Sequence, residues 1–502
     1  MTVDVVAALL WLTTVVLGAS TLVRMRRPMD VALLAPASWL GLIAIPAMLP
    51  VFRGLSSAFH AEFVGLPRDN LFLAISLANF MFFSVHRVVD HDAFASLRGR
   101  FDAAFGIQTN ERGSGLVTRY WFVGLLAVAV GLALLHWWLM PRVPIWSLVV
   151  GVDDPRQLAL DRENSAKLLS APVLLKYMFT WNSRILLPIL LCAAVLLRWR
   201  AAAAFVFVFG LLYIMSPLEK LPSMLFVLSP FIAVAIRDRR RFWTPLLLAG
   251  LALSLVPPWL ITQSYPISNS IHAAVGAPVD ARPHPTIPAS ALSASPVPPS
   301  PLVEPLPYEP GATFNTTSAW ATFMDLVIRR IGSGPIEVTY SWFQYFPAEH
   351  GGFLNGAGWA PWTALSPDRK SPANLVGLWA YYGHSGYDIA SLSAYASFVA
   401  DGWAEFGFLG VLMVCLALFL LVVLLEVLGG FLTSPFSLAC YAPALLLVAL
   451  IPPQGGVPAL LFSLGVALSP LIWLAYLFST RVVAGSPSGG RAGREARVTA
   501  GP

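Results

Sequence analysis

The sequence carries little charge for its length. Asp, Glu, Lys and Arg make up only 12% of the 502 residues, whereas 57% are hydrophobic and the mean hydropathy is +0.71. Soluble domains have about 25% charged residues. This composition excludes an ordinary soluble protein and predicts an all-α, polytopic integral membrane protein.

Cysteine and common enzyme motifs are also scarce. The three cysteines, Cys192, Cys415 and Cys440, all fall within apolar runs, which argues against a disulfide framework and against a metal site built on thiolates. The chain has no P-loop, HExxH, GxSxG or Cys/His metal spacing, so nucleotide hydrolysis and zinc chemistry have no visible basis. We expect no metal, no cofactor and no nucleic-acid partner.

Apolar runs, by contrast, are abundant, and they approach the roughly 20 residues that a spanning helix needs. About eleven transmembrane helices are predicted, eight within 1–262 and three within 399–480. They lie at 3–23, 29–50, 71–86, 120–139, 182–197, 201–215, 222–236, 242–262, 404–428, 437–452 and 457–478. Arginine clusters follow alternate runs, which explains the net charge of +6 and places the N-terminus outside and the C-terminus in the cytoplasm. The tail 481–502 is predicted to be disordered.

One long polar segment, 263–398, is predicted to form an extracytoplasmic loop. Its part 277–310 is rich in Pro, Ala and Ser, a composition typical of a disordered, dispensable insert. In 318–331 the apolar residues have the i, i+3, i+4, i+7 spacing of an amphipathic helix, with the Gly and Pro of 332–335 predicted to end it.

Two adjacent arginines on this predicted helix have different interpretations. Arg329 follows Asp325 by four residues, which favours a surface ion pair. Arg330 lies at the edge of the apolar stripe, where it binds a lipid phosphate or serves as an interfacial anchor.

The aromatic stretch that follows contains Trp342 and Tyr345 and leads to Glu349 and His350. Aromatic rings hold sugars, and a carboxylate or imidazole can accept a proton from an attacking hydroxyl. The alternative is an aromatic belt at the membrane interface with a solvated turn. His384 has the same two interpretations.

Asp401 and Glu405 are one helical turn apart at the predicted start of the ninth span. Such a pair can hold one raised pKa for acid or base chemistry, or it can mark the water boundary of the span, with Gly407 and Gly410 allowing close helix packing.

The outward segment 141–181 carries more basic residues than the positive-inside rule predicts, among them Arg162, and Arg184 follows it closely. We interpret this excess as a site for an anionic ligand.

The chain resembles the bacterial oligosaccharide repeat unit polymerases, the Wzy-type O-antigen and exopolysaccharide polymerases, in four features and in their order along the sequence. These features are the segment around Arg162, the pair Arg329 and Arg330, the aromatic stretch and the sequence ASFVADGWAEFGFLG. The similarity in motifs covers 153–184 and 318–410, and the hydropathy pattern covers the whole chain. The proline-rich insert departs from the usual loop of the family.

The resemblance implies a metal-independent glycosyltransferase of the bacterial inner (plasma) membrane. Its substrate would be an undecaprenyl-pyrophosphate-linked oligosaccharide, with membrane lipid around it and a chain-length regulator as a further partner. Arg162, Arg184 and Arg330 would then bind the pyrophosphate, with Trp342, Tyr345 and Glu405 also contacting substrate. His350, Glu349 or His384 would act as the base.

Three other classes stay open. An O-antigen ligase shares the donor and the architecture. A multi-span lipid-phosphosugar glycosyltransferase would have an acidic pair in its first outer loop. Glu62 and Asp69 do not form such a pair. A flippase or other transporter favours charged or broken helices at mid-membrane, whereas most of the predicted spans carry charge only at their ends.

Overall fold

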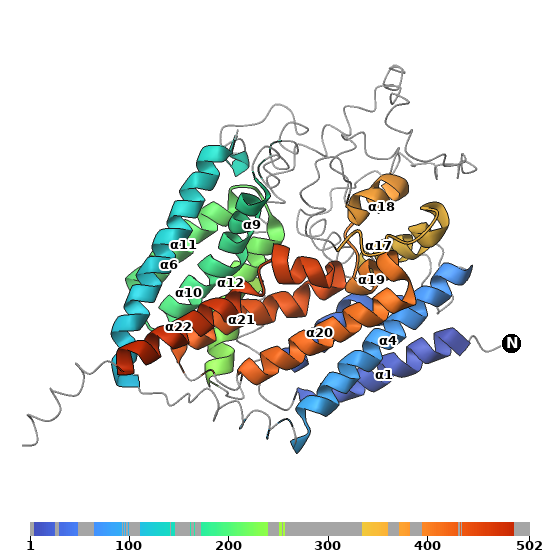
Figure 1. Cartoon of the computed structure of the whole chain (residues 1–502), viewed down its shortest axis with the longest axis horizontal. Helices are drawn as coiled ribbons and strands as arrows, with labels where there is room; N and C mark the ends of the chain where they lie inside the picture. The colour runs from blue at the N-terminus through green and yellow to red at the C-terminus, as the bar shows by residue number, and fades with distance from the viewer. Residues whose placement is uncertain are drawn as a thin grey trace, which may run out of the picture.

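The computed structural model of the chain describes residues 5–25, 30–48, 65–92, 111–140, 142–145, 172–238, 334–359, 371–381, 394–429 and 434–485, with single residues between them such as Asp161 and Ser165. Within these ranges every regular element is a helix (Figure 1). The all-α prediction is therefore confirmed for the described part of the chain.

Six helices are long and apolar enough to cross a membrane, as expected of a polytopic membrane protein. They are α1 (Val5–Arg24), the run α2, η1 and α3 (Val31–Met48), α4 (Gly65–Val89), Gly115–Leu139 within α6 (Glu111–Leu139), Leu174–Leu196 and α20 (Phe408–Gly429). The segment Leu174–Leu196 combines α9 (Val173–Trp181), the π-helical η4 (Asn182–Leu186) and α10 (Leu187–Leu196). Four shorter apolar helices lie in α11 (Arg200–Met215), α12 (Lys220–Asp238), α21 (Pro435–Leu450) and α22 (Leu468–Gly485).

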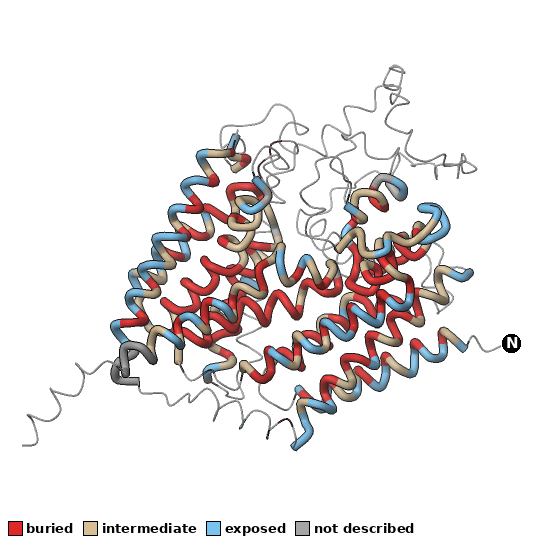
Figure 2. Tube along the Cα trace, in the orientation of Figure 1, coloured by how far each residue is buried: buried red, intermediate tan, exposed pale blue. Residues whose placement is uncertain are grey.

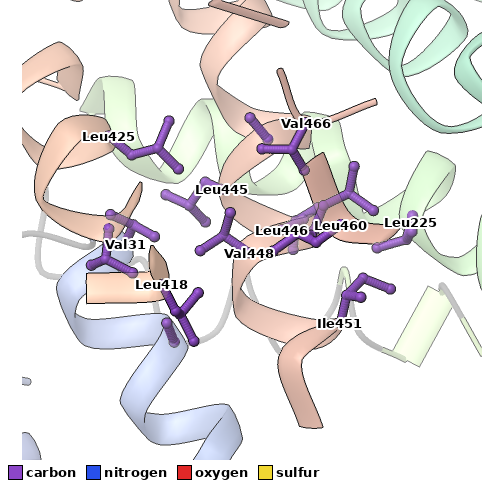
Figure 3. Close-up of a cluster of buried hydrophobic side chains, with 14 of the residues drawn as sticks. Val31, Leu225, Leu418, Leu425, Leu445, Leu446, Val448, Ile451, Leu460 and Val466 are labelled. Atoms are coloured by element: carbon purple, nitrogen blue, oxygen red, sulfur yellow. The ribbon is translucent and has the colours of Figure 1, made fainter. Parts of the chain in front are cut away.

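The centre of the molecule is α21, which is buried along nearly its whole length. It packs against α10 and α12 on one side and α2 on the other, so it joins the two halves of the bundle (Figure 1). Its side chains Leu445, Leu446 and Val448 meet Leu418 of α20 and Leu225 of α12 in one apolar cluster (Figure 3). A helix that is apolar on all sides suits such a buried position.

Exposed positions follow the peripheral helices α1 and α6 (Figure 2), and many of them carry large apolar side chains. Leu12 is 56% exposed on α1, and Val123 is 62% exposed on α6. An apolar surface of this extent is stable against hydrocarbon rather than water, which agrees with a membrane location for these helices.

A buried ion-pair network joins α1, α2 and α4. Arg24, at the end of α1, is only 4% exposed and contacts Asp30 and Asp90 at 2.6 Å each. Asp30 also caps α2 by accepting a hydrogen bond from the Leu33 N–H. These two carboxylates neutralise the charge of Arg24 where the ends of the three helices meet.

The predicted continuous span 457–478 is interrupted in the structure. After the 3-10 turn η10 (Pro452–Gln454) and the π-helical η11 (Ala459–Ser463), α22 begins only at Leu468. The Ser469 hydroxyl donates to the Cys440 carbonyl near the start of α21. The segment 451–467 therefore returns along α21, from its end to the level of Cys440. Its irregular backbone is packed against protein.

The predicted span 404–428 is likewise divided. A short helix, α19 (Phe398–Phe406), ends at Gly407, whose φ of 61° favours glycine, and α20 then begins at Phe408. The two helices touch through Gly402 and Gly410, where a Cβ on Gly410 would lie 1.9 Å from the Gly402 oxygen. Asp401 and Glu405 thus lie on a separate helix, whereas the predicted close packing at Gly410 is confirmed.

The second half of the long polar segment is folded onto the bundle. Helix α17 (Gly334–Gln344) leads into η7 (Tyr345–Glu349), and α18 (Pro372–Tyr381) follows (Figure 1). Gly334 and Pro335 begin a helix here instead of only ending one, because proline suits a first helical turn. The predicted helix 318–331 and the insert 277–310 lie outside the described residues.

Candidate functional site

A polar pocket lies where the end of α6 meets α9, η4 and the turn between α11 and α12, and it encloses about 420 Å³ of space that includes open solvent. Its lining mixes hydroxyl, imidazole, ammonium and carboxylate groups with a few apolar ones. The residues are His136, Lys176, Phe179, Thr180, Ser183, Tyr213, Ile214, Pro217, Glu219 and Pro222. Such a combination inside an apolar bundle is typical of a ligand site.

One helix supplies the polar side of the pocket. Lys176, Thr180 and Ser183 are spaced i, i+4 and i+7, which places them on one face of the α9 and η4 run. The π-helical turn of η4 contains Ser183 and Arg184, and such turns occur often at functional sites. Of the residues in this turn, Ser183 lines the pocket.

Arg184 reaches this pocket through Glu219, to which its Nη2 lies 3.5 Å from Oε2. Its side chain is 17% exposed, and its Nε is buried without a hydrogen-bond partner among the described residues. Burying a donor without an acceptor costs roughly 1–3 kcal/mol. The long ion pair and the spare donor leave the guanidinium able to bind an additional anion.

His136 has a structural role at the base of the pocket. Its ring stacks on Phe179 with centroids 4.2 Å apart. Nδ1 lies 2.9 Å from the Tyr213 hydroxyl and Nε2 lies 3.2 Å from the Ser165 carbonyl. Both ring nitrogens are therefore occupied, and the ring fixes α6 against α9 and α11.

The same contact brings the predicted arginine-bearing segment to the pocket. Ser165 is fully buried, and its hydroxyl donates to the carbonyls of Asp161 and Arg142. Arg162 itself lies outside the described residues. Its neighbours Asp161 and Ser165 are nevertheless anchored beside His136.

A second group of polar residues surrounds Asp401 on α19. The Trp359 indole N–H donates to Asp401 Oδ2 at 2.8 Å, and a Cβ on Gly456 would lie 2.4 Å from that oxygen. Burial raises the pKa of Asp401 to about 6, and the hydrogen bond from Trp359 opposes this effect. The residue as a whole is half-buried.

Glu405, one turn later on α19, is fully buried. Its carboxylate packs against Gly358, where an added Cβ would lie 1.8 Å from Oε1. The two carboxylates that the sequence placed on one face of a helix thus have different surroundings, one partly exposed and one enclosed.

Four hydrogen bonds attach the segment 345–359 to α19. The Trp403 indole N–H donates to the Phe346 carbonyl at 2.8 Å. The backbone N–H groups of Leu354 and Asn355 donate to the carbonyls of Ala404 and Glu405 at 2.9 and 2.8 Å, and the Trp359 bond is the fourth. This segment, which contains His350, therefore moves with the helix that carries Asp401.

The predicted site residues on this segment are placed as follows. Trp342 is only 4% exposed, and its indole N–H donates to the Ala394 carbonyl, so it belongs to the core. Tyr345 is half-buried, whereas Glu349 and His350 are exposed. His350 Nδ1 lies 3.1 Å from the Gly352 carbonyl.

His384 and Arg330 lie outside the described residues, as does Arg162, and their predicted roles stay predictions.

The segment 451–467 contacts both Asp401 of α19 and Trp181 of α9. At one end Gly456 faces Asp401. Further along, the Phe462 carbonyl accepts a hydrogen bond of 2.7 Å from the indole of Trp181, which lies on α9. A Cβ on Gly465 would also lie 2.5 Å from the Trp181 ring. The segment 451–467 therefore packs against both α19 and α9.

The charged residues of the two polar regions could be recognised in the sequence, but the residues that pack around them could not. Lys176 and Glu219 were visible as charged residues near apolar runs, and Asp401 as one of a carboxylate pair. Trp359 and Gly456 had no local signal, because their contacts with Asp401 come from distant parts of the chain.

No protein-family model matches the chain, and comparisons with curated proteins and with solved structures give no match.

Proposed function

We propose that the protein polymerises lipid-linked oligosaccharide repeat units by glycosyl transfer at the extracytoplasmic face of the bacterial inner membrane. The observation that carries this proposal is the polar pocket with Lys176 in its wall and the incompletely paired Arg184 beside it. A pyrophosphate leaving group requires fixed positive charge, and a guanidinium binds two phosphate oxygens at once. The resemblance to the repeat unit polymerases supplies the substrate class.

In the proposed reaction a hydroxyl of one lipid-linked repeat unit attacks the anomeric carbon of a chain carried on another lipid pyrophosphate. The new glycosidic C–O bond forms as the bond from that carbon to the pyrophosphate oxygen breaks, and the electron pair leaves with the pyrophosphate. Arg184 and Lys176 stabilise the negative charge that develops there. The proton of the attacking hydroxyl passes to a base.

For this base we propose Asp401 in place of the residues chosen from sequence. A carboxylate with a pKa of about 6 is ionised at neutral pH and basic enough to accept a proton. Glu349 and His350 are exposed on the attached segment and stay candidates for contacts with the acceptor, as does His384.

The test is the ladder of lipid-linked polymer in cells that express each variant at equal membrane abundance. Arg184→Lys and Arg184→Gln should both reduce long products by about tenfold or more, because an ammonium lacks the planar fork. Arg200→Lys is the matched control, since Arg200 is exposed at the opposite end of α11 from Tyr213. Ladders of equal length for both Arg184 variants and the control would contradict the proposal.

The same reasoning applies to two arginines outside the described residues. Arg162→Lys and Arg330→Lys should shorten the ladder, whereas Arg329→Lys, with Asp325 as its local partner in the sequence, should have little effect.

A transporter of polysaccharide lipids is the second candidate. It is favoured by the interrupted helices at η4 and in the segment 451–467, because transporters bind substrate at such breaks. Purified protein in proteoliposomes decides between the two. Movement of a fluorescent lipid-linked oligosaccharide across the bilayer without any longer product would favour the transporter, and polymer formation without movement would favour the polymerase.

A further inference from the structure

An exposed group of aromatic rings lies on the segments beside α19. Tyr345 of η7 and Trp379 of α18 have ring centroids 5.5 Å apart, and His350 lies 5.8 Å from Tyr345. Phe346 is buried beneath them, 4.9 Å from Tyr345 and 5.0 Å from His350. We call Tyr345, Trp379 and His350 the aromatic platform.

The platform is open to the surface. Trp379 is 39% exposed, His350 is exposed and Tyr345 is half-buried, although the core beside them is closely packed. The three rings come from two different elements, and neither element is among the six long apolar helices. Rings that anchor a span in the interface lie along that span, so the platform requires a different explanation.

Polar groups at the edge of the platform identify the chemistry of its ligand. The Glu349 carboxylate is close enough to Tyr345 to add to the effect of burial in raising the pKa of the Tyr345 hydroxyl. Glu349 and His350 are both exposed. Ring faces bordered by a carboxylate and an imidazole suit a ligand with an apolar face and a rim of hydroxyl groups, which describes a pyranose sugar.

We propose that the platform binds a sugar ring of the acceptor repeat unit, with Trp379 as its main contact. This inference rests on the proposed function and adds a subsite to it. Tyr345 and His350 of the platform lie on the segment 345–359, which is hydrogen-bonded to α19, so these two rings are attached to the helix that carries Asp401. Such attachment limits the positions that the attacking hydroxyl can take relative to its base.

The first experiment measures sugar binding without any transfer reaction. Full-length protein in lipid nanodiscs is titrated with oligosaccharide fragments released by mild acid from the surface polysaccharide of the producing cells, followed by saturation-transfer NMR. Trp379→Leu should weaken binding by about tenfold, because the stacking surface is lost. Trp379→Tyr should retain most of the affinity. Trp138→Leu is the control, since Trp138 is 79% exposed on α6.

The second experiment is the polymer ladder of the same three variants. Weaker binding and shorter polymer for Trp379→Leu alone support the proposal. Equal affinities for Trp379→Leu and Trp138→Leu overturn it, as does a wild-type protein that does not bind the fragments at saturating concentration. If binding depends on Trp379 but no polymer forms, the sugar subsite stands and the polymerase function fails. If polymer forms normally in Trp379→Leu, the subsite fails and the function stands.

Discussion

At the scale of single residues, the environment of each ionisable group decides what it can do. Asp401 and Glu405 are the same kind of acid one turn apart, yet only Asp401 combines partial exposure with an indole donor. Arg24 and Arg184 are both largely buried guanidinium groups, but Arg24 has two carboxylates at 2.6 Å whereas Arg184 has one at 3.5 Å. Residue type alone does not separate these roles.

Replacing Trp359 with phenylalanine tests Asp401 as the base. The indole N–H stabilises the ionised carboxylate, so Trp359→Phe should raise the pKa of Asp401 further above its ordinary value. A base acts in its deprotonated form, so the transfer rate rises with pH through this pKa. The midpoint of the curve of transfer rate against pH should therefore shift from about 6 to a higher pH. The rate under alkaline conditions should change little.

The measurement is the initial rate of polymer formation by purified protein in proteoliposomes across a pH series. Asp401→Asn should be inactive at every pH, and Trp138→Phe should keep the wild-type midpoint. An unchanged midpoint in Trp359→Phe together with an active Asp401→Asn would exclude Asp401 as the base.

At the scale of elements, interruptions of helices create the candidate site. The π-helical η4 brings Ser183 and Arg184 to the pocket, and the irregular segment 451–467 places Gly456 against Asp401. An uninterrupted helix would satisfy its backbone hydrogen bonds internally and present side chains at regular angles. The breaks allow backbone and polar groups to meet inside an otherwise apolar bundle.

The contact of α19 with α20 makes a second prediction. A methyl group on Gly410 would collide with the Gly402 carbonyl, and neither backbone can move without displacing its helix. Gly410→Ala should therefore destabilise the protein by about 1–3 kcal/mol. Gly124→Ala on α6, where no heavy atom lies within 4 Å of the added carbon, should be neutral or stabilising by about 1 kcal/mol.

Thermal unfolding in detergent, followed by intrinsic fluorescence, gives the comparison. If Gly410→Ala and Gly124→Ala melt at the same temperature as the wild type, the close approach of α19 and α20 does not contribute to stability.

At the scale of the whole molecule, the helices form two groups joined by α21 (Figure 1). Helices α9, α17 and α18 lie along one side of the bundle, at the top of Figure 1. The proposed function requires this side to be extracytoplasmic. The positive-inside rule predicts the same orientation, since it assigns the arginine clusters to the cytoplasm.

Reporter fusions test this orientation directly. A periplasmic phosphatase fused at Ser295 should be active, and the same reporter fused at Arg239 should be inactive, at equal levels of membrane protein. The opposite pair of activities would invert the topology and remove the basis for a site that faces outward.

The membrane class and most helix positions could be predicted from the sequence, because hydropathy is a local property of the chain. The runs near 3–23 and 71–86 lie within α1 and α4 apart from terminal residues, and α11 and α12 lie close to 201–215 and 222–236. The count of eleven spans stays a prediction, since most of 242–262 lies outside the described residues. The excess of positive charge near Arg184 was also accessible, because charge in an outward segment is a local signal, whereas its role in binding an anion stays a prediction.

Only the tertiary structure decided which of these residues can act. Trp342 is in the core while Trp379 is exposed, Glu219 pairs with Arg184, and Asp401 is enclosed by Trp359 and Gly456. Burial and pKa depend on the groups that pack around a side chain, and here those groups come from positions far away in the chain. The breaks in 404–428 and 457–478 contain Gly407 and Gly465, whose positive φ interrupts a helix, and the contact between Gly402 and Gly410 fixes the geometry of the first break.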